Sequence, residues 1–300
     1  MLGVVFSGGG AAGCFQVGAI KAMEEMGIRP DMVAGVSTGN LQAAMVAQGK
    51  IDKLYQIWSR IKESDIYIRR YSIWQLGWKY LWSKLKLTRF NIEAIYDFKP
   101  LYNLIRKNVA EDDFKIPFRC GVTCFEDSLY YTIHAGDKDR SAHEHLHEFV
   151  FASASMPIYA PSVKIAGRHY YDGGLRNQTP LREAVEYGCD EIIMLLCSPL
   201  TLDRRTFRPH IEDIAERTLE IILNEGANED LGYMKFINEL VDQDCLEPRY
   251  RNIKFTVIAP KEQVVDTLDF DRKKLERGLQ IGYDRAMDII KNSDYGTPSA

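Results

Sequence analysis

Apolar residues occur along this chain in short continuous runs, separated by longer segments in which they recur at helical spacing. The short runs predict buried strands at residues 2–6, 32–36, 118–125, 129–134, 163–165, 169–171, 191–196 and 253–258. The amphipathic segments predict helices at residues 15–26, 41–47, 144–154, 181–187, 210–224 and 271–291. Strands that alternate with helices favour a mostly parallel sheet covered on both faces. The expected fold class is therefore α/β, in a three-layer α/β/α arrangement.

Residues 51–107 depart from this alternation, because they contain no convincing strand. All four tryptophans of the chain lie there, namely Trp58, Trp74, Trp78 and Trp82. Between Asp65 and Glu93 there is no acidic residue, whereas six residues are cationic: Arg69, Arg70, Lys79, Lys84, Lys86 and Arg89. We interpret residues 51–107 as a helical insertion or cap.

The basic aromatic stretch at residues 66–92 has two interpretations. Its tryptophans and cations predict peripheral contact with a membrane surface or the lining of an acyl channel. The alternative is that these aromatic side chains form the insertion's own core. We expect a single domain that spans residues 1–300, with a further helical region at about 205–292.

Composition narrows the class of protein further. The formal net charge of -4 argues against a general nucleic-acid binder. The six cysteines are spread along the chain without metal-ligand spacing, so we expect buried free thiols in a reducing compartment and no metal site. There is no signal-peptide pattern and no apolar run of about 18 residues. We therefore expect a cytoplasmic protein that contacts membranes only peripherally, and its oligomeric state is open.

The pentapeptide Gly35-Val36-Ser37-Thr38-Gly39 has the pattern GxSxG and lies between an expected strand and an expected helix. In a nucleophile elbow the strand turns abruptly into the helix, which holds the serine in a strained conformation with its hydroxyl exposed. The flanking glycines leave room for that turn and for a substrate carbonyl. The first amides of the helix favour developing negative charge. Ser37 is therefore a candidate nucleophile.

A second glycine-rich turn, with the sequence GGGAAG at residues 8–13, follows the first expected strand. Its backbone amides predict an anion site, and Gly8, Gly10 and Gly13 also fit the dinucleotide pattern GxGxxG. A dinucleotide-binding fold would end its second strand in an acidic residue, which this chain lacks there. If both turns end neighbouring parallel strands, the loop amides and Ser37 meet at one edge of the sheet. We favour an oxyanion hole over a nucleotide site on this geometry.

A serine nucleophile needs a base, and no histidine is marked for that role by its surroundings. The histidines at residues 143–147 are spaced by two, and we interpret them as a solvated polar turn. A different turn, Asp172-Gly173-Gly174, follows two short expected strands. Taken alone, this sequence predicts only a tight turn.

With that turn included, the chain resembles the patatin-like phospholipase family, whose members pair a serine with an aspartate and use no histidine. Three separated motifs carry the resemblance: the glycine loop, the elbow and the Asp172-Gly173-Gly174 turn. Residues 152–157 (ASASMP) and 177–180 (NQTP) also resemble the family. The resemblance extends over roughly residues 1–197. It departs at Ala12, where the family usually carries Arg or Lys, so head-group preference and catalytic strength do not carry over.

The resemblance implies a serine lipid acyl hydrolase that cleaves carboxylic esters of phospholipids or lysophospholipids. Ser37 would form the acyl-enzyme, Asp172 would act as its base, and the amides of Gly8, Gly9 and Gly10 would form the oxyanion hole. This chemistry needs no metal and no organic cofactor. Two alternatives remain open: an acyltransferase or thioesterase with the same pair of residues, and a non-catalytic module that binds an anion or a lipid.

Overall fold

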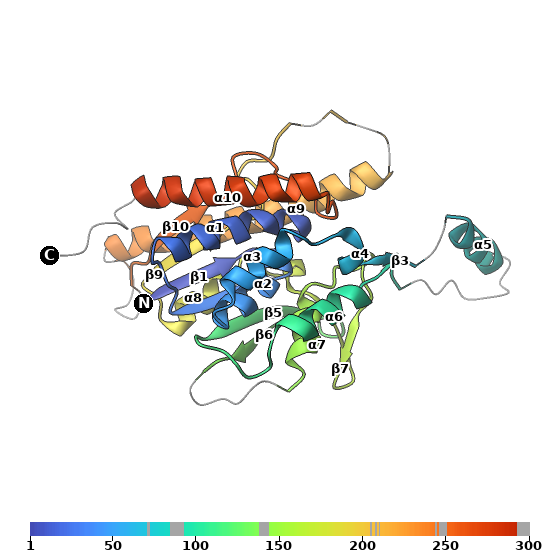
Figure 1. Ribbon diagram of the computed structural model, residues 1–300, viewed down its shortest axis with the longest axis horizontal. Coiled ribbons are helices and arrows are strands. Elements are labelled where there is room, and N and C mark those ends of the chain that lie inside the picture. Colours follow the sequence, from blue (N-terminus) through green and yellow to red (C-terminus); the bar gives the residue numbers. More distant parts are fainter. Residues whose placement is uncertain are drawn as a thin grey trace.

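A mixed sheet forms the centre of the protein (Figure 1). The computed structural model describes residues 1–70, 73–84, 93–137, 144–204, 206–207, 209, 211–243, 245 and 251–292. Eight strands have the order β10-β9-β1-β2-β5-β8-β7, with β6 also paired to β5. Strand pairs from β10 to β5 are parallel, whereas the pairs β5–β6, β5–β8 and β7–β8 are antiparallel. The strands are β1 (Leu2–Phe6), β2 (Met32–Gly35), β5 (Phe118–Cys124), β6 (Tyr130–Ala135), β7 (Val163–Ile165), β8 (Arg168–Asp172), β9 (Glu191–Leu195) and β10 (Lys254–Ile258). The predicted α/β class and mostly parallel sheet are confirmed.

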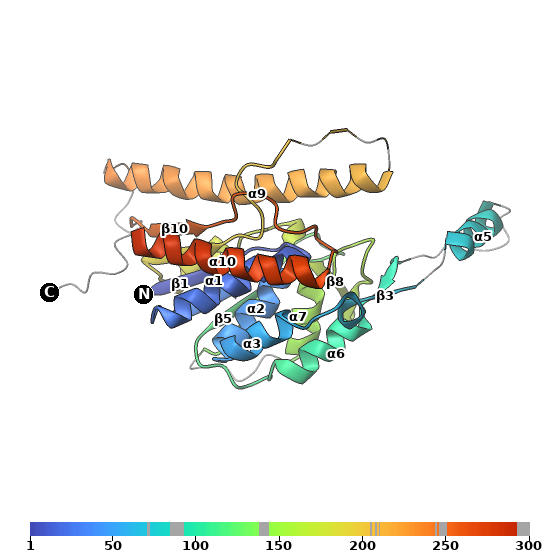
Figure 2. The same ribbon diagram turned by 45° about the horizontal axis from the view of Figure 1, so that its top comes forward.

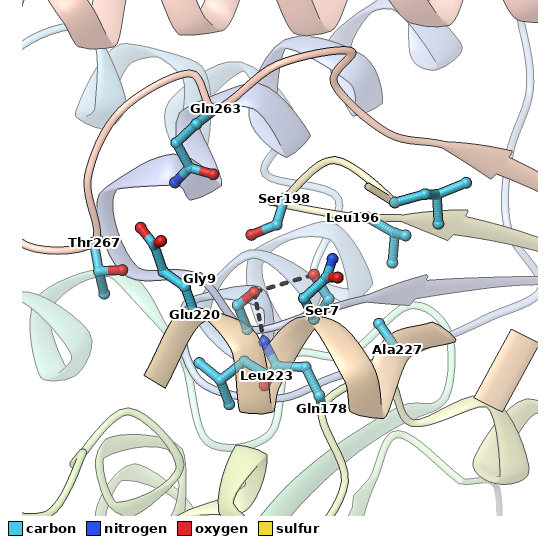
Figure 3. A pocket seen from close by; sticks show the side chains of 13 residues that line it. Ser7, Gly9, Gln178, Leu196, Ser198, Glu220, Leu223, Ala227, Gln263 and Thr267 are labelled. Atoms are coloured by element: carbon cyan, nitrogen blue, oxygen red, sulfur yellow. Dashed lines mark hydrogen bonds between the residues drawn. The ribbon is translucent and has the colours of Figure 1, made fainter. Parts of the chain in front are cut away.

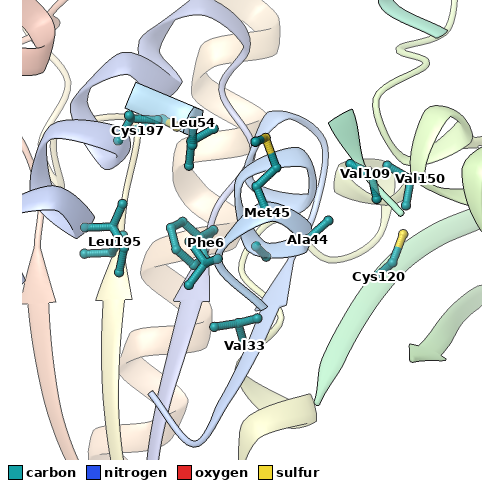
Figure 4. Close-up of a cluster of buried hydrophobic side chains, with 14 of the residues drawn as sticks. Phe6, Val33, Ala44, Met45, Leu54, Val109, Cys120, Val150, Leu195 and Cys197 are labelled. Carbon is teal, nitrogen blue, oxygen red and sulfur yellow. The ribbon is translucent and has the colours of Figure 1, made fainter. Parts of the chain in front are cut away.

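Alternate side chains of the central strands point to opposite faces of the sheet, where they form two separate hydrophobic clusters. Val4 and Phe6 of β1 pack in a cluster with α1, α2, α7 and α10, whereas Val5 packs in a second cluster with α8 and α9. Figure 4 shows Phe6, Val33 and Leu195 of the first cluster extending from neighbouring strands. The helices of these layers are α1 (Gly13–Glu25), α2 (Thr38–Ala47), α7 (Leu146–Ser153), α8 (Leu181–Tyr187), α9 (Ile211–Asp242) and α10 (Arg272–Asn292).

Strand β5 has different partners along its two halves. Its first half pairs in parallel with β2, so that Gly35 lies opposite Cys120. Its second half pairs antiparallel with β8, so that Asp172 lies opposite Val122. Because β2 runs with β5 and β8 runs against it, the carboxyl ends of β2 and β8 meet. The sheet thus brings Asp172 next to the turn that follows β2.

Residues 51–107 form a mainly helical insertion with α3 (Ile51–Trp58), α4 (Glu63–Ile66), α5 (Ile73–Lys84) and α6 (Lys99–Asn108). Two short strands, β3 (Ile68–Arg69) and β4 (Tyr96–Asp97), pair antiparallel inside it, so the expectation of no strand there is wrong. Two residues are too few for an alternating pattern to be read from the sequence. Helix α5 projects away from the rest of the chain in both Figure 1 and Figure 2. Residues 71–72 and 85–92 of the basic aromatic stretch lie outside the described residues.

Helix α9 is much longer than expected, because the predicted end at residue 224 is wrong and the helix continues to Asp242. Gly226 and Gly232 lie inside it, and each costs only about 1 kcal/mol relative to alanine in a helix. Figure 2 shows α9 along one side of the molecule, beyond α10. Of the helices that the structure describes, none has the length and hydrophobicity to cross a bilayer.

Candidate active site

Ser37 occupies the tight turn between β2 and α2. Its backbone angles, φ 56° and ψ -130°, are strained for a residue other than glycine. A Cβ atom on Gly39 would lie 2.4 Å from the carbonyl oxygen of Ser7, so glycine is required for α2 to begin this close to β1. The Ser37 amide donates a hydrogen bond of 3.1 Å to Oγ of Ser153, a fully buried residue at the end of α7. Ser37 therefore lies at the strained strand-to-helix turn that the GxSxG pattern predicts.

Asp172 is the last residue of β8 and precedes the short helical turn η2 (Gly173–Leu175). Only 1% of its surface is exposed, and its Oδ1 accepts a hydrogen bond of 2.8 Å from the Gly174 amide. Burial raises the pKa of this carboxyl to about 7, and interactions with the Ser37 side chain and the Gly174 amide oppose that rise. Its Oδ2 has no hydrogen-bond partner among the described residues. A carboxyl group in this state can take up and return a proton near neutral pH.

The glycine loop after β1 lies directly beside Ser37, because a Cβ atom on Gly8 would approach Cβ of Ser37 to 3.0 Å. Gly8 is held by Gln178: its amide donates to the Gln178 carbonyl at 3.3 Å, and its carbonyl accepts from Nε2 of Gln178 at 3.0 Å. Gly10 has a φ of 57°, which favours glycine. In the part of the chain that the structure describes, the amides of Gly9 and Gly10 donate no hydrogen bond. The loop and the serine thus meet at one edge of the sheet.

The other glycines of the predicted site lie at the ends of the same elements. Gly35 is the last residue of β2, Gly13 is the first residue of α1, and Gly173 begins the turn η2. A Cβ atom on Gly173 would lie 2.4 Å from the Gly121 carbonyl oxygen of β5. The turn after Asp172 therefore packs directly on the strand that joins β2 to β8.

A cavity of about 940 Å³ opens beside these groups. Gly9, Gly10, Ser37 and Asp172 line one part of it. Most of the remaining wall consists of apolar side chains from α2, α3, α4, α6, α9 and residues 154–159. A large apolar cavity with a few polar groups at one place suits a long acyl chain whose ester reaches those groups.

The aromatic residues of the insertion are divided between core and surface. Trp58 is 6% exposed and belongs to both the hydrophobic core and the cavity wall. Trp78 and Trp82 of α5 are 60% and 44% exposed. The side chain of Trp74 lies outside the described part of the chain. Trp58 of the insertion is therefore a core residue, whereas Trp78 and Trp82 of the aromatic stretch are surface residues.

A small cavity of about 30 Å³ with a mixed polar and apolar lining also borders the glycine loop (Figure 3). Its lining includes Ser7, Gly8, Ser198 and Glu220, and its size suits a single water molecule. Gln178 borders this cavity and the large one. Gln178 therefore links the loop to both cavities.

Two residues that the sequence analysis did not assign to the site, Ser153 and Arg69, belong to it by contact. Ser153 holds the Ser37 amide, and Arg69 lines the large cavity. No histidine of the described residues lines that cavity, and His143 and His210 lie outside them. No group of three His, Cys, Asp or Glu residues that could hold a metal occurs in the described ranges.

A strained serine turn after a strand of the central sheet, beside an apolar cavity, is the geometry of a nucleophile elbow. A family model described as patatin-like phospholipase matches residues 4–185, and the chain belongs to this family.

Curated relatives carry the name lysophospholipase NTE1. The Kluyveromyces lactis protein is 25% identical over 308 residues, which are 97% of this chain and 19% of the relative. The Candida glabrata protein is 28% identical over 300 residues, which are 94% of this chain and 16% of the relative. The chain therefore spans less than a fifth of the length of these two relatives.

Two solved structures cover nearly all of the chain at low identity. VipD from Legionella pneumophila is 15% identical with a TM-score of 0.48, over 96% of this chain and 66% of that one. Human GIVD cytosolic phospholipase A2 in complex with methyl gamma-linolenyl fluorophosphonate is 8% identical with a TM-score of 0.44. The match covers 95% of this chain and 57% of that one.

Proposed function

We propose that this chain hydrolyses the carboxylic ester bond of phospholipids or lysophospholipids through an acyl-enzyme on Ser37, with Asp172 as the base. The observation that carries the proposal is that Ser37 lines a large apolar cavity together with Asp172, whose carboxyl pKa is raised to about 7. The names of the curated relatives support a lysophospholipid substrate.

In the proposed reaction, Asp172 accepts the hydroxyl proton of Ser37 while the serine Oγ attacks the ester carbonyl carbon. The amides of Gly9 and Gly10 donate to the resulting oxyanion, and Gly8 keeps the loop in place through its bonds to Gln178. The bond to the leaving alcohol then breaks, and Asp172 returns the proton to that alcohol. Water, deprotonated by Asp172, attacks the acyl carbonyl carbon; the bond to the Ser37 Oγ then breaks, Asp172 returns the proton to that oxygen, and the fatty acid leaves.

We also propose that α5 brings the protein to a lipid surface. Trp78, Leu81 and Trp82 are 60%, 52% and 44% exposed, and their spacing places them on one face of the helix. Tryptophan and leucine side chains on a projecting helix insert into the boundary between head groups and acyl chains. The cations of this stretch would favour anionic lipid.

The central test is fluorophosphonate labelling together with ester hydrolysis. We expect the wild-type protein to be labelled on Ser37, and Ser37→Ala and Asp172→Asn each to lower turnover at least about a thousandfold. Circular dichroism of both variants checks that the fold is retained. Absence of labelling would favour a binding module. Labelling without water-dependent turnover, but with transfer of the acyl group to an added alcohol or thiol, would favour an acyltransferase.

A further inference from the structure

Arg69 and Asp172 are the only acidic or basic side chains among the described residues that line the large cavity. Asp172 lies beside Ser37, whereas Arg69 belongs to the exposed strand β3 and therefore marks the mouth of the cavity. We propose that Arg69 binds the phosphate of a single-chain phospholipid whose acyl ester is at Ser37. This assignment rests on the proposed function and names its substrate class: phosphate-bearing monoacyl esters in preference to neutral ones.

The Arg69 guanidinium is available to a ligand. No ion pair or side-chain hydrogen bond is found for it within the described part of the chain, and the residue is exposed. An arginine fork binds two phosphate oxygens at once, and this charge-assisted pairing is stronger at the edge of an apolar cavity than in open solvent. The glycine loop supplies no competing cation, because residues 8–13 are glycines and the two buried alanines Ala11 and Ala12. Among the described residues that line the cavity, Arg69 is therefore the side chain whose charge can neutralise a phosphate.

Strand β3 is fixed to the wall of the cavity by backbone hydrogen bonds. Arg69 pairs with Tyr96 across β3 and β4. Next to this pair, the Arg70 amide donates to the Ile95 carbonyl at 3.1 Å, and the Ile95 amide donates to the Ile158 carbonyl at 2.8 Å. Arg69 is thus tied to the segment 154–159, of which Ala154 and residues 156–159 line the cavity.

The other end of this wall is bonded to Asp172. The Asp172 amide donates to the Ser155 carbonyl at 3.0 Å, and Ala154, Met156 and Pro157 line the cavity beside it. Ile158 has a φ of 74°, an unusual conformation for a β-branched residue, and is 68% exposed. One short segment therefore connects Arg69 to Asp172, so the distance between phosphate and ester is set by backbone contacts rather than by a free loop.

Arg70 provides the matched control. It has the same charge, is exposed, and follows Arg69 directly, but it does not line the cavity. The experiment compares wild type, Arg69→Gln, Arg69→Lys and Arg70→Gln on 1-lauroylglycerol 3-phosphate and 1-lauroylglycerol, each below its critical micelle concentration. We expect Arg69→Gln to lower kcat/KM for the phosphate ester about tenfold or more and to leave the neutral ester within about twofold. Arg69→Lys should fall between these limits, and Arg70→Gln should match wild type.

A second measurement does not depend on turnover. Dodecyl phosphate should bind Ser37→Ala protein about tenfold more weakly when Arg69→Gln is added, and unchanged when Arg70→Gln is added. Equal losses on both esters, or equal effects of Arg69→Gln and Arg70→Gln, would overturn the assignment. A loss seen only with substrate in anionic vesicles would show that Arg69 contacts the bilayer instead. If wild type cleaves no ester but dodecyl phosphate still requires Arg69, the phosphate site stands and the proposed hydrolysis fails.

Discussion

At the scale of single residues, the strained backbone of Ser37 is maintained by contacts from distant parts of the chain. Conformations of this kind cost about 1–3 kcal/mol and persist only where surrounding structure fixes them. Here the Ser37 amide bonds to the buried Ser153 hydroxyl, and α2 begins in contact with the end of β1 through Gly39. Ser153 is therefore a positioning residue for the proposed nucleophile.

We predict that Ser153→Ala lowers kcat/KM about 10- to 100-fold, because it leaves the Ser37 amide without its acceptor and lets the hydroxyl move from its position. In the wild type, kcat/KM should rise with pH to a plateau through about pH 7, where Asp172 loses its proton. Ser153→Ala should lower that plateau without moving the midpoint. Ester hydrolysis measured from pH 5 to 9 gives both values.

Ser155→Ala is the control for this prediction, since Ser155 is equally buried but, among the described residues, its hydroxyl bonds only to the Phe151 carbonyl, at 3.0 Å. Comparable losses in the two variants would assign the effect to general disturbance of this segment. A Ser153→Ala protein with wild-type rates would remove Ser153 from the site.

At the scale of elements, α5 and α9 expose apolar surface for which the described chain provides no cover. Helix α5 projects from the molecule with Trp78, Leu81 and Trp82 exposed. On α9, Tyr233 and Phe236 are 65% and 54% exposed. The two helices differ in charge, because α9 is strongly acidic whereas the stretch around α5 is basic. Only α5 combines exposed tryptophans with the charge that suits anionic lipid.

We predict that the double variant Trp78→Ser/Trp82→Ser binds anionic vesicles at least about tenfold more weakly than wild type in a sedimentation assay at low salt. Hydrolysis of a monomeric soluble ester should stay unchanged, because neither tryptophan lines the cavity. Phe236→Ser on α9 serves as the matched loss of an exposed aromatic side chain. Vesicle binding that depends equally on Phe236, or not at all on the tryptophans, would argue against α5 as the lipid contact.

At the scale of the whole molecule, buried carboxyl groups oppose folding at high pH. Burial raises the pKa of Asp172 and of Asp230 on α9 to about 7, and it raises the pKa of Glu183 on α8. A carboxyl whose pKa is higher in the folded state binds more protons folded than unfolded. Below about pH 4 the protonated carboxyl therefore makes its full contribution to the free energy of unfolding. That contribution falls as pH rises from about 4 to about 7, and the free energy of unfolding does not change further through this group above about pH 7.

We predict that Asp172→Asn is more stable than wild type at pH 8, by roughly a few kcal/mol, and nearly equal to it at pH 4. An asparagine removes the cost of burying a charge and can still accept from the Gly174 amide. Urea denaturation at pH 4, 6 and 8 measures the difference between the two proteins. A stability difference that does not grow with pH would mean that burial does not raise the pKa of Asp172.

Local patterns of the sequence predicted most element types of the central sheet and its helices, and two of the three parts of the candidate site. Strand and helix periods depend on neighbouring residues, so β1, β2, α1 and α2 and the two glycine-flanked turns could be placed from the sequence. The turn at Asp172 looked like an ordinary tight turn, and only the family resemblance marked it. The end of α9 and the strands β3 and β4 were missed because their local signals are weak.

The tertiary structure decided which distant groups meet. Asp172 reaches the end of β2 because β5 changes its partner from β2 to β8, and no spacing in the sequence encodes that change. Ser153 and Arg69 join the site in the same way, through α7 and the β3–β4 pair. The chain itself specifies a strained serine and an amide-rich loop because these depend on glycine and on adjacent residues. Their partners depend on sheet order and long-range packing, which only the folded chain fixes.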